Sequence, residues 1–272
     1  MSKLVDRFLV KPGSKVRLAD HDPRETAGLD KETVADLMAK ARERMFLLQR
    51  RLYAEGKRGL LVILQGMDAA GKDGTIREAF ASLNAQGTHV VSFKAPTSTE
   101  LSHDFLWRVH QACPPKGHVT IFNRSQYEDI LIVRVEGLAP ESVWKRRYEH
   151  INAFERMLHD EGTVVLKFFL NLSKDEQKER LRERVHDPER HFKFNPGDLD
   201  SRRKWDEYVE AYEAMLEKCS TDEAPWHIIP ADRNWLRNYA VAAITLDAME
   251  RMDPQLPRVE VDVAAAEAML EE

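Results

Sequence analysis

Apolar positions along this chain follow two different periods, and together they predict an α/β fold. Between residues 30 and 56, apolar side chains recur at three- and four-residue steps, at Val34, Leu37, Met38, Ala41, Met45, Leu48 and Leu52. That spacing predicts an amphipathic helix. Short apolar runs, which predict buried strands, follow at residues 60–64, 89–93, 118–122, 164–172 and 226–229.

Helix-forming stretches of roughly a dozen residues or more separate these runs. Alternation of this kind predicts a parallel sheet with helices on both faces. No internal repeat or low-complexity linker interrupts it, so we expect one domain over residues 1–272. Its expected parts are an N-terminal arm and helix (1–58, with residues 1–28 extended), a core (59–172), a lid region (173–204), a C-terminal core (205–252) and an acidic tail (253–272).

The first strand ends in a glycine-rich turn with the spacing Gly66-x4-Gly71-Lys72, which is that of a P-loop. Glycines let backbone N–H groups converge on phosphate oxygens at the positive end of the next helix. Lys72 adds a point charge that can follow a phosphoryl group. The alternative is a turn that only joins a strand to a helix, but both flanks favour phosphate binding. The expected phosphate contacts are Gly66, Ala69, Ala70, Gly71, Lys72, Gly74 and Thr75.

Two acids stand in or beside this loop. Asp73 occupies the position where a P-loop usually has Ser or Thr, and Asp68 lies inside the loop. Carboxylates beside bound polyanions repel them unless cations intervene, so a hard divalent metal, Mg²⁺ or Mn²⁺, is expected here.

A second group of polar residues follows the run at 118–122, in the segment Asn123-Arg124-Ser125-Gln126-Tyr127-Glu128-Asp129. Ligands gather at the carboxyl ends of parallel strands, so this segment is expected beside the P-loop. Arg124, and Arg134 further on, could stabilise charge on a transferred group. Ser125 and Glu128 also fit a capping box, and both interpretations can hold together. The segment Lys94-Ala95-Pro96-Thr97 ends another strand and could border an acceptor nucleotide.

Residues 173–204 are rich in Lys and Arg, and two prolines and a glycine interrupt their middle. This composition is typical of a mobile lid that carries cations over phosphates. Arg180 and Arg184 share a helix face, and Lys193 follows in the loop. The alternative is a solvated helix with Glu–Arg pairs, but the upstream P-loop favours the lid.

Composition narrows the class of protein. Hydrophobic content of 43% and charged content of 32% are ordinary for a soluble enzyme, and no apolar run is long enough to span a membrane. The N-terminus is too short and too charged for a signal peptide, and the spacing of Cys113 and Cys219 indicates reduced thiols in a cytoplasmic protein. Net charge is −5, and the tail alone contributes that amount, so the neutral remainder argues against a general nucleic-acid binder.

Four motifs, QGMDAAGKDGTI, FNRSQYEDILIVRV, LKFFLNLSKDEQKERLRER and APWHIIPADRNWLRN, together resemble the polyphosphate kinase 2 family. The resemblance runs from about residue 10 to about residue 250. It implies a three-layer P-loop kinase fold of the thymidylate-kinase type with a helical lid. It also implies inorganic polyphosphate as donor, a nucleotide as acceptor, and Mg²⁺ or Mn²⁺.

Carried onto this chain, the resemblance puts Lys72 on phosphates, Arg124 beside the transferred group, and Arg180, Arg184 and Lys193 in the lid. The expected catalytic residues are Asp68, Lys72, Asp73, Asn123, Arg124 and Glu128. Expected metal ligands are Asp68 and Glu128, Arg134 joins the polyphosphate track, and the expected nucleotide contacts are Lys94, Pro96, Thr97, Arg124 and Tyr127.

Many family members read Asp-Arg-Ser-x-Tyr-Asn where this chain has Asn123 first and Glu128 last. That variant resembles class III of the family, whose members phosphorylate both AMP and ADP. Two alternatives remain: an ATP-dependent nucleotide kinase, against which Asp73 counts, and a regulatory P-loop switch or polyanion-binding module. Adenine nucleotides are the expected acceptors, with guanine nucleotides allowed and no nucleic acid or membrane partner. A homo-oligomer, dimer or tetramer, is expected because such arms and tails often pack on neighbours.

Overall fold

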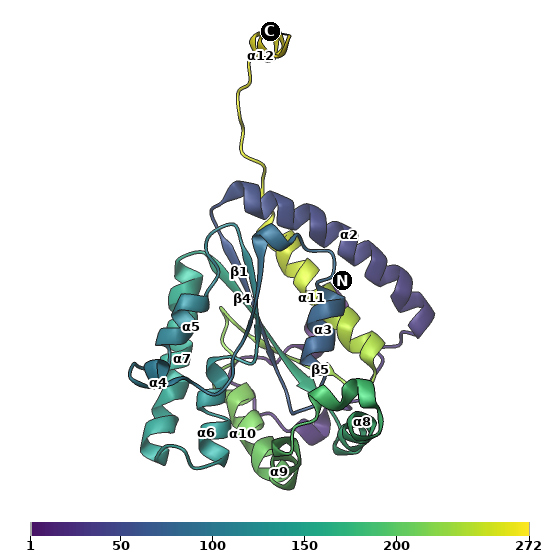
Figure 1. The fold of residues 1–272 in the computed structure, drawn as a ribbon, viewed down its shortest axis with the longest axis vertical. Helices are drawn as coiled ribbons and strands as arrows, with labels where there is room; N and C mark the ends of the chain where they lie inside the picture. Colours follow the sequence, from purple (N-terminus) through teal and green to yellow (C-terminus); the bar gives the residue numbers. More distant parts are fainter. Residues whose placement is uncertain (1, 272) are drawn as a thin grey trace.

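The computed structural model describes residues 2–271 and is built around a five-stranded parallel sheet (Figure 1). Its strands are β1 (Gly59–Gln65), β2 (Thr88–Ser92), β3 (Val119–Asn123), β4 (Thr163–Asn171) and β5 (Trp226–Pro230). They lie in the order β2-β3-β1-β4-β5, with every neighbouring pair parallel. Each apolar run in the sequence corresponds to one strand, so the predicted fold class is confirmed.

Helices cover both faces of the sheet, which gives three layers (Figure 1). In β1, Leu60, Val62 and Leu64 pack with α1 (Ser2–Phe8), α2 (Lys31–Glu55), α3 (Lys72–Ala79) and α11 (Asn234–Met252). Its alternate residues Leu61 and Ile63 pack with α5 (Trp107–Ala112), α7 (Glu141–Asp160) and α10 (Trp205–Lys218). Because both faces are buried, the strand is apolar at nearly every position instead of alternating.

The N-terminal segment is only partly as expected. The predicted helix at 30–56 is confirmed as α2, where the Asp30 side chain caps the first turn and Gly56 ends the helix with φ 62°. The expectation that residues 1–28 are extended is wrong for Ser2–Phe8, which form α1 and bury Phe8 against the core. A helix of seven residues is too short for its period to stand out in the sequence.

The connections on the β2 side of the sheet are shorter than expected. Besides α3 they contain η2 (Ala85–Gly87) before β2, and α4 (Ser98–Leu101) and α5 before β3. Strand β2 is at the edge, and Val90 in it is 53% exposed. An edge strand needs less covering surface, so short helices suffice there.

The remaining elements frame the carboxyl edge of the sheet and the chain end. After β3 come η3 (Gln126–Asp129) and α6 (Ile132–Val135), and the predicted lid region contains α8 (Lys174–His186), η4 (Pro188–Lys193) and α9 (Gly197–Arg203). The N-terminal segment also contains η1 (Leu18–Asp20). The tail leaves the body as an extended segment and ends in α12 (Val263–Leu270) (Figure 1). Within residues 2–271, no helix combines the length and apolar character needed to cross a bilayer.

Candidate active site

The loop between β1 and α3 has a backbone that only small residues can adopt. Gly66 has φ 154° and Gly71 has φ 99°. A Cβ on Gly66 would lie 2.9 Å from the Leu170 carbonyl oxygen, and a Cβ on Gly71 would lie 2.1 Å from Arg237 Nη1. Both positions therefore require glycine. Between them Ala69 also has a positive φ, 63°, and strain of this kind is concentrated at functional sites.

Lys72 begins α3 and folds back over the loop. Its Nζ donates to the carbonyl oxygens of Gly66 (2.7 Å) and Met67 (3.3 Å), and the residue is only 8% exposed. Burial, followed by the nearby charge of Arg124, lowers the pKa of Lys72 to about 8. A polyanion bound in the loop would supply the negative charge that this ammonium group lacks.

The ends of β1 and β3 lie side by side, as the sequence predicted, with Leu64 paired in register with Asn123. Asn123 Nδ2 donates to Asp73 Oδ1 at 2.6 Å, which ties the end of β3 to the start of α3. The next residue, Arg124, has φ 63° and donates its backbone N–H to the Leu64 carbonyl at 3.1 Å. This strained turn aims the Arg124 side chain back toward the P-loop.

Arg124 lies between the two carboxylates that were expected to bind metal. Its Nη2 atom is 2.6 Å from Asp68 Oδ1, and Nη1 is 3.5 Å from Glu128 Oε2. Glu128, and then Asp68, raise the pKa of Arg124 above its usual value against the opposing effect of burial. Three predicted catalytic residues are therefore brought into direct contact, with the guanidinium as their link.

The donor atoms here fit a metal that arrives with its substrate. Hard carboxylate oxygens suit Mg²⁺, which binds proteins through one or two carboxylates and takes its other ligands from phosphates and water. Among residues 2–271 no group of three His, Cys, Asp or Glu side chains forms a ready cage. Asp68 and Glu128 as the metal ligands therefore remain a prediction, and each would have to turn from Arg124 toward the ion.

Gln65, a residue that the sequence pattern did not single out, is hydrogen-bonded to the turn after β3. In the amide orientation that satisfies both of its polar atoms, Gln65 donates to Glu128 Oε1 (3.1 Å) and accepts from the Ser125 N–H (3.2 Å). Ser125 caps η3 as predicted, accepting from the Tyr127 N–H at 3.3 Å, but Glu128 is not its capping-box partner. An uncharged residue at a strand end carries no distinctive signal in the sequence.

The position of the Tyr127 side chain disagrees with the prediction that it contacts a nucleotide. Its side chain is fully buried, and its hydroxyl donates to Glu155 Oε1 (2.7 Å) and accepts from Lys167 Nζ (2.9 Å). Glu155 and Lys167 themselves form a buried ion pair at 2.6 Å. Burial raises the pKa of Tyr127 well above its usual value. The side chain anchors η3 in the core.

The lid arginines divide into two roles. Arg180 does not point at the phosphate side of the loop: its Nη1 donates to the carbonyls of Ala69 (3.1 Å) and Ala70 (3.2 Å). Arg184 Nη1 instead pairs with Asp198 Oδ2 at 2.9 Å and also donates to the Lys193 carbonyl at 3.3 Å. Direct phosphate binding by Arg180 therefore disagrees with its position, whereas Arg184 and Lys193 lie together in the predicted lid region.

Other predicted contacts lie elsewhere. Thr75 is buried, and its hydroxyl accepts from Arg237 Nε at 2.8 Å, so it faces α11 and not the phosphate side. Arg134 lies 3.5 Å from Glu210 and stacks over Trp144, outside the P-loop cluster.

The nucleotide-side candidates Lys94, Pro96 and Thr97 are all exposed in the loop after β2. Arg108 holds that loop by donating to the Lys94 carbonyl at 2.9 Å, and Thr97 caps α4 in a capping box. The loop is thus open to an acceptor, and these contacts remain a prediction.

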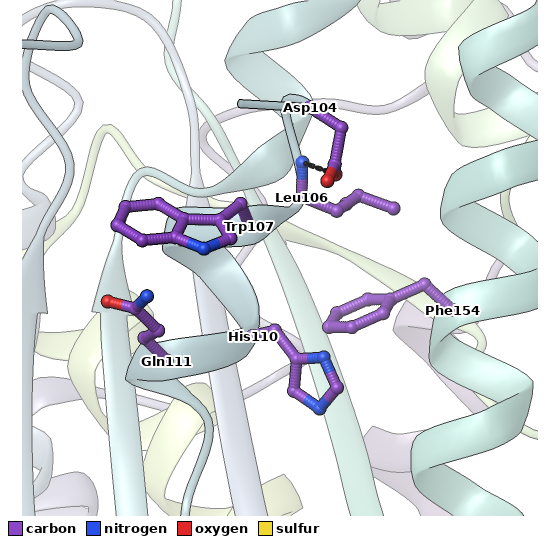
Figure 2. Close-up of a pocket in the computed structure, with 6 residues that line it drawn as sticks. All are labelled: Asp104, Leu106, Trp107, His110, Gln111 and Phe154. Atoms are coloured by element: carbon purple, nitrogen blue, oxygen red, sulfur yellow. Dashed lines mark hydrogen bonds between the residues drawn. The ribbon is translucent and has the colours of Figure 1, made fainter. Parts of the chain in front are cut away.

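A separate pocket of about 320 Å³ lies between α5 and α7, and its lining residues are drawn in Figure 2. Its lining residues are Asp104, Leu106, Trp107, His110, Gln111 and Phe154. None of them belongs to the P-loop or to the segment after β3. The predicted phosphate site lies instead at the carboxyl edge of the sheet.

The fold is that of a P-loop kinase: strand β1 leads through a glycine-rich loop into a helix that begins with the buried Lys72. The fold closely matches the crystal structure of polyphosphate kinase 2 from Arthrobacter aurescens TC1, with a TM-score of 0.94 and 43% identity over 98% of this chain and 96% of that one. Residues 28–257 match the sequence profile of polyphosphate kinase 2. The chain belongs to the polyphosphate kinase 2 family and is a phosphotransferase.

Two relatives are similar over nearly their whole length. The AMP/ADP-polyphosphate phosphotransferase of Meiothermus ruber is 50% identical over 256 residues, 93% of this chain and 96% of the relative. The ADP-polyphosphate phosphotransferase of Rhodopseudomonas palustris is 40% identical over 264 residues, 92% of this chain and 91% of the relative.

Proposed function

We propose that this protein transfers the terminal phosphoryl group of inorganic polyphosphate to AMP and to ADP, giving ADP and ATP, in a reversible and metal-assisted reaction. The observation that carries the proposal is the convergence of Lys72 and Arg124 on the P-loop among three carboxylates. The activity named for the Meiothermus ruber relative supports it.

The chemistry of the donor suits this site. Polyphosphate is charged on every residue and has no base to recognise, so its site needs cations and metal and not an apolar slot. The P-loop, Arg124 and the lid pair Arg184 and Lys193 supply cations at one edge of the sheet. Electrostatic preorganisation of this kind is usually the largest single contribution to phosphoryl transfer.

The protein's own side chains need only align two polyanions and neutralise them. The terminal phosphate oxygen of a nucleotide is already ionised, so the reaction does not depend on a strong general base. Lys72 binds the donor's phosphates from within the loop, and Arg124 lies where charge develops on the transferred group. A bound Mg²⁺ or Mn²⁺, held by Asp68 and Glu128, would offset the repulsion between donor and acceptor.

The proposed range of acceptor nucleotides follows from the exchange of an amide and an acid at the two sequence positions on either side of Arg124. Asn123 and Glu128 reverse the order found in many members of the family. We propose that this arrangement accepts AMP as well as ADP, as the name of the Meiothermus ruber relative states for that protein. Guanine nucleotides remain allowed, because no residue of the site is assigned to the base.

The deciding experiment omits ATP. Purified protein is incubated with Mg²⁺, long-chain polyphosphate and AMP, and the nucleotides are followed by chromatography. ADP followed by ATP supports the proposal. Product from ADP but not from AMP removes the dual acceptor range. Activity only with ATP as donor favours an ordinary nucleotide kinase, and binding without turnover favours a polyanion-binding module.

Two further properties belong to the same proposal. Both cysteines are free thiols, with Cys219 buried, and we place the protein in the cytoplasm, where thiols stay reduced. Assembly as a dimer or tetramer stays a prediction, which light scattering on a sizing column would test.

A further inference from the structure

Arg237, on α11 behind the P-loop, is a buried cation without an acidic partner among the described residues. It is 3% exposed, and every hydrogen bond that it donates there goes to a neutral oxygen. The acceptors are Thr75 Oγ1 (2.8 Å), Ala70 O (3.1 Å), Asn234 Oδ1 (2.7 Å) and Asn238 Oδ1 (3.0 Å). Burial, with the nearby Arg180 and Arg77, lowers the pKa of Arg237 to about 9. An unpaired buried charge opposes folding, so packing alone does not explain this residue.

Arg180 reaches the same loop from α8. Its guanidinium donates to the Ala69 and Ala70 carbonyls, and on its other side to the carbonyls of Ala231 (2.8 Å) and Asp232 (3.0 Å). The Ala70 carbonyl thus accepts from two arginines that belong to helices far apart in the sequence. We call Arg180 and Arg237 the arginine clamp.

The direction of the Ala70 carbonyl determines the direction of an amide that can bind phosphate. A peptide unit is planar and trans, so its C=O and N–H point in opposite directions. When the clamp holds the Ala70 carbonyl away from the phosphate side, the Gly71 N–H turns toward it. The first amides of α3 follow directly and have no partner within the helix.

We propose that Arg237 and Arg180 are positioning residues for phosphoryl transfer, and that the clamp presets the P-loop amides before substrate binds. Gly71 and Arg237 form a matched pair in this device, because a Cβ at position 71 would lie 2.1 Å from Arg237 Nη1. The inference rests on the proposed function for its kinetic test only.

The clamp also joins the lid to the core. Asp232, whose carbonyl Arg180 holds, accepts from the Ser173 N–H (2.8 Å) and hydroxyl (2.7 Å) at the start of α8. The base of the lid, the loop after β5 and the P-loop therefore form one bonded unit. Movement of the lid must occur beyond Arg180, on the side of Arg184.

The test compares Arg237→Met with Arg237→Lys in the full-length enzyme. Methionine has a side chain of similar length but removes the charge and the hydrogen-bond donors. Lysine keeps the charge but lacks the planar guanidinium group. We expect both to lower kcat by about 10²-fold, as for other small misplacements of a site. We also expect faster amide hydrogen exchange at residues 67–74. Melting curves of both variants check that they are folded, because methionine leaves the oxygens that accept from Arg237 without that donor.

Thr245→Val is the matched control, since Thr245 is a fully buried polar residue of α11 whose hydroxyl bonds within its own helix, to the Val241 carbonyl. The Thr245→Val variant should keep the turnover of wild type and its rate of amide hydrogen exchange at the P-loop. Near-normal kcat and unchanged exchange in Arg237→Met would overturn the clamp. Full rescue by lysine would also overturn it, because charge alone would then suffice. An inactive wild type would remove the proposed function, while hydrogen exchange would still decide the clamp.

Discussion

Asn123 Nδ2 donates to Asp73 Oδ1 at 2.6 Å, and this one hydrogen bond joins two of the positions where the chain departs from the usual P-loop kinase pattern. Asp73 replaces the usual hydroxyl after the lysine, and Asn123 replaces the usual acid at the end of the neighbouring strand. The two side chains therefore form one direct contact between the start of α3 and the end of β3.

This hydrogen bond predicts that mutations at the two positions are coupled. Asn123→Asp alone places two carboxylates in contact, and we expect it to lower kcat/KM by at least ~10-fold, because like charges this close oppose one another. Asp73→Asn combined with Asn123→Asp should recover most of that loss. A double-mutant cycle in kcat/KM measures the coupling, which we expect at about 1–3 kcal/mol. Strictly additive effects would show that the hydrogen bond has no role in turnover.

Lys72 and Arg124 are predicted to carry most of the charge stabilisation. Replacement of either by alanine should cut turnover on the order of 10²-fold or more, which corresponds to ~3 kcal/mol in the barrier. Steady-state kinetics with polyphosphate and ADP measure it. The control is Lys145→Ala, because Lys145 is an exposed lysine paired with Glu141 on the surface of α7. Near-normal rates in either active-site variant would contradict the assignment.

The pH dependence of activity should reflect Lys72. Since its pKa in the folded protein is about 8, kcat/KM should fall as pH rises through 8, while kcat should persist to higher pH because bound phosphates favour the charged form. A kcat/KM that is flat to about pH 10, near the ordinary pKa of a lysine, would contradict the prediction.

The contribution of Lys72 to folding stability should rise over the pH range in which kcat/KM falls. The pKa of Lys72 lies below its ordinary value of 10.5, so between about 8 and 10.5 the unfolded chain binds more protons than the folded one. The contribution of Lys72 to the free energy of unfolding therefore rises with pH. It is measured as the difference between wild type and Lys72→Met in denaturant titrations at about pH 7 and about pH 10, which cancels the similar contribution of Arg237.

Gly71→Ala should separate backbone strain from contact with Arg237. The substitution forces a side chain into φ 99° and within 2.1 Å of Arg237 Nη1. We expect a loss of ~1–3 kcal/mol in stability together with a large loss of turnover. Gly137→Ala is the matched control, with φ 63° and no described atom within 4 Å of the added Cβ. The Gly137→Ala variant should lose only the ~1 kcal/mol of stability that a positive φ costs a residue with a side chain, and it should retain activity.

The sequence alone determined the strands, the P-loop and the position of Arg124 beside it. These depend on local spacing, and parallel strands necessarily bring their carboxyl ends to one edge. For the same reason the place of Asn123 at the end of an apolar run was enough to predict that it lies near the loop.

Only the tertiary structure decided which atoms the predicted cations contact. Arg180 and Arg184 occupy the same helix face, yet one is bonded to the loop carbonyls and the other to Asp198. Arg237 contacts Ala70 across 167 positions of sequence, and Tyr127 meets Lys167 across 40. A guanidinium or hydroxyl binds whichever partners the packed helices bring to it. Residue type and local spacing therefore carry no information about those partners.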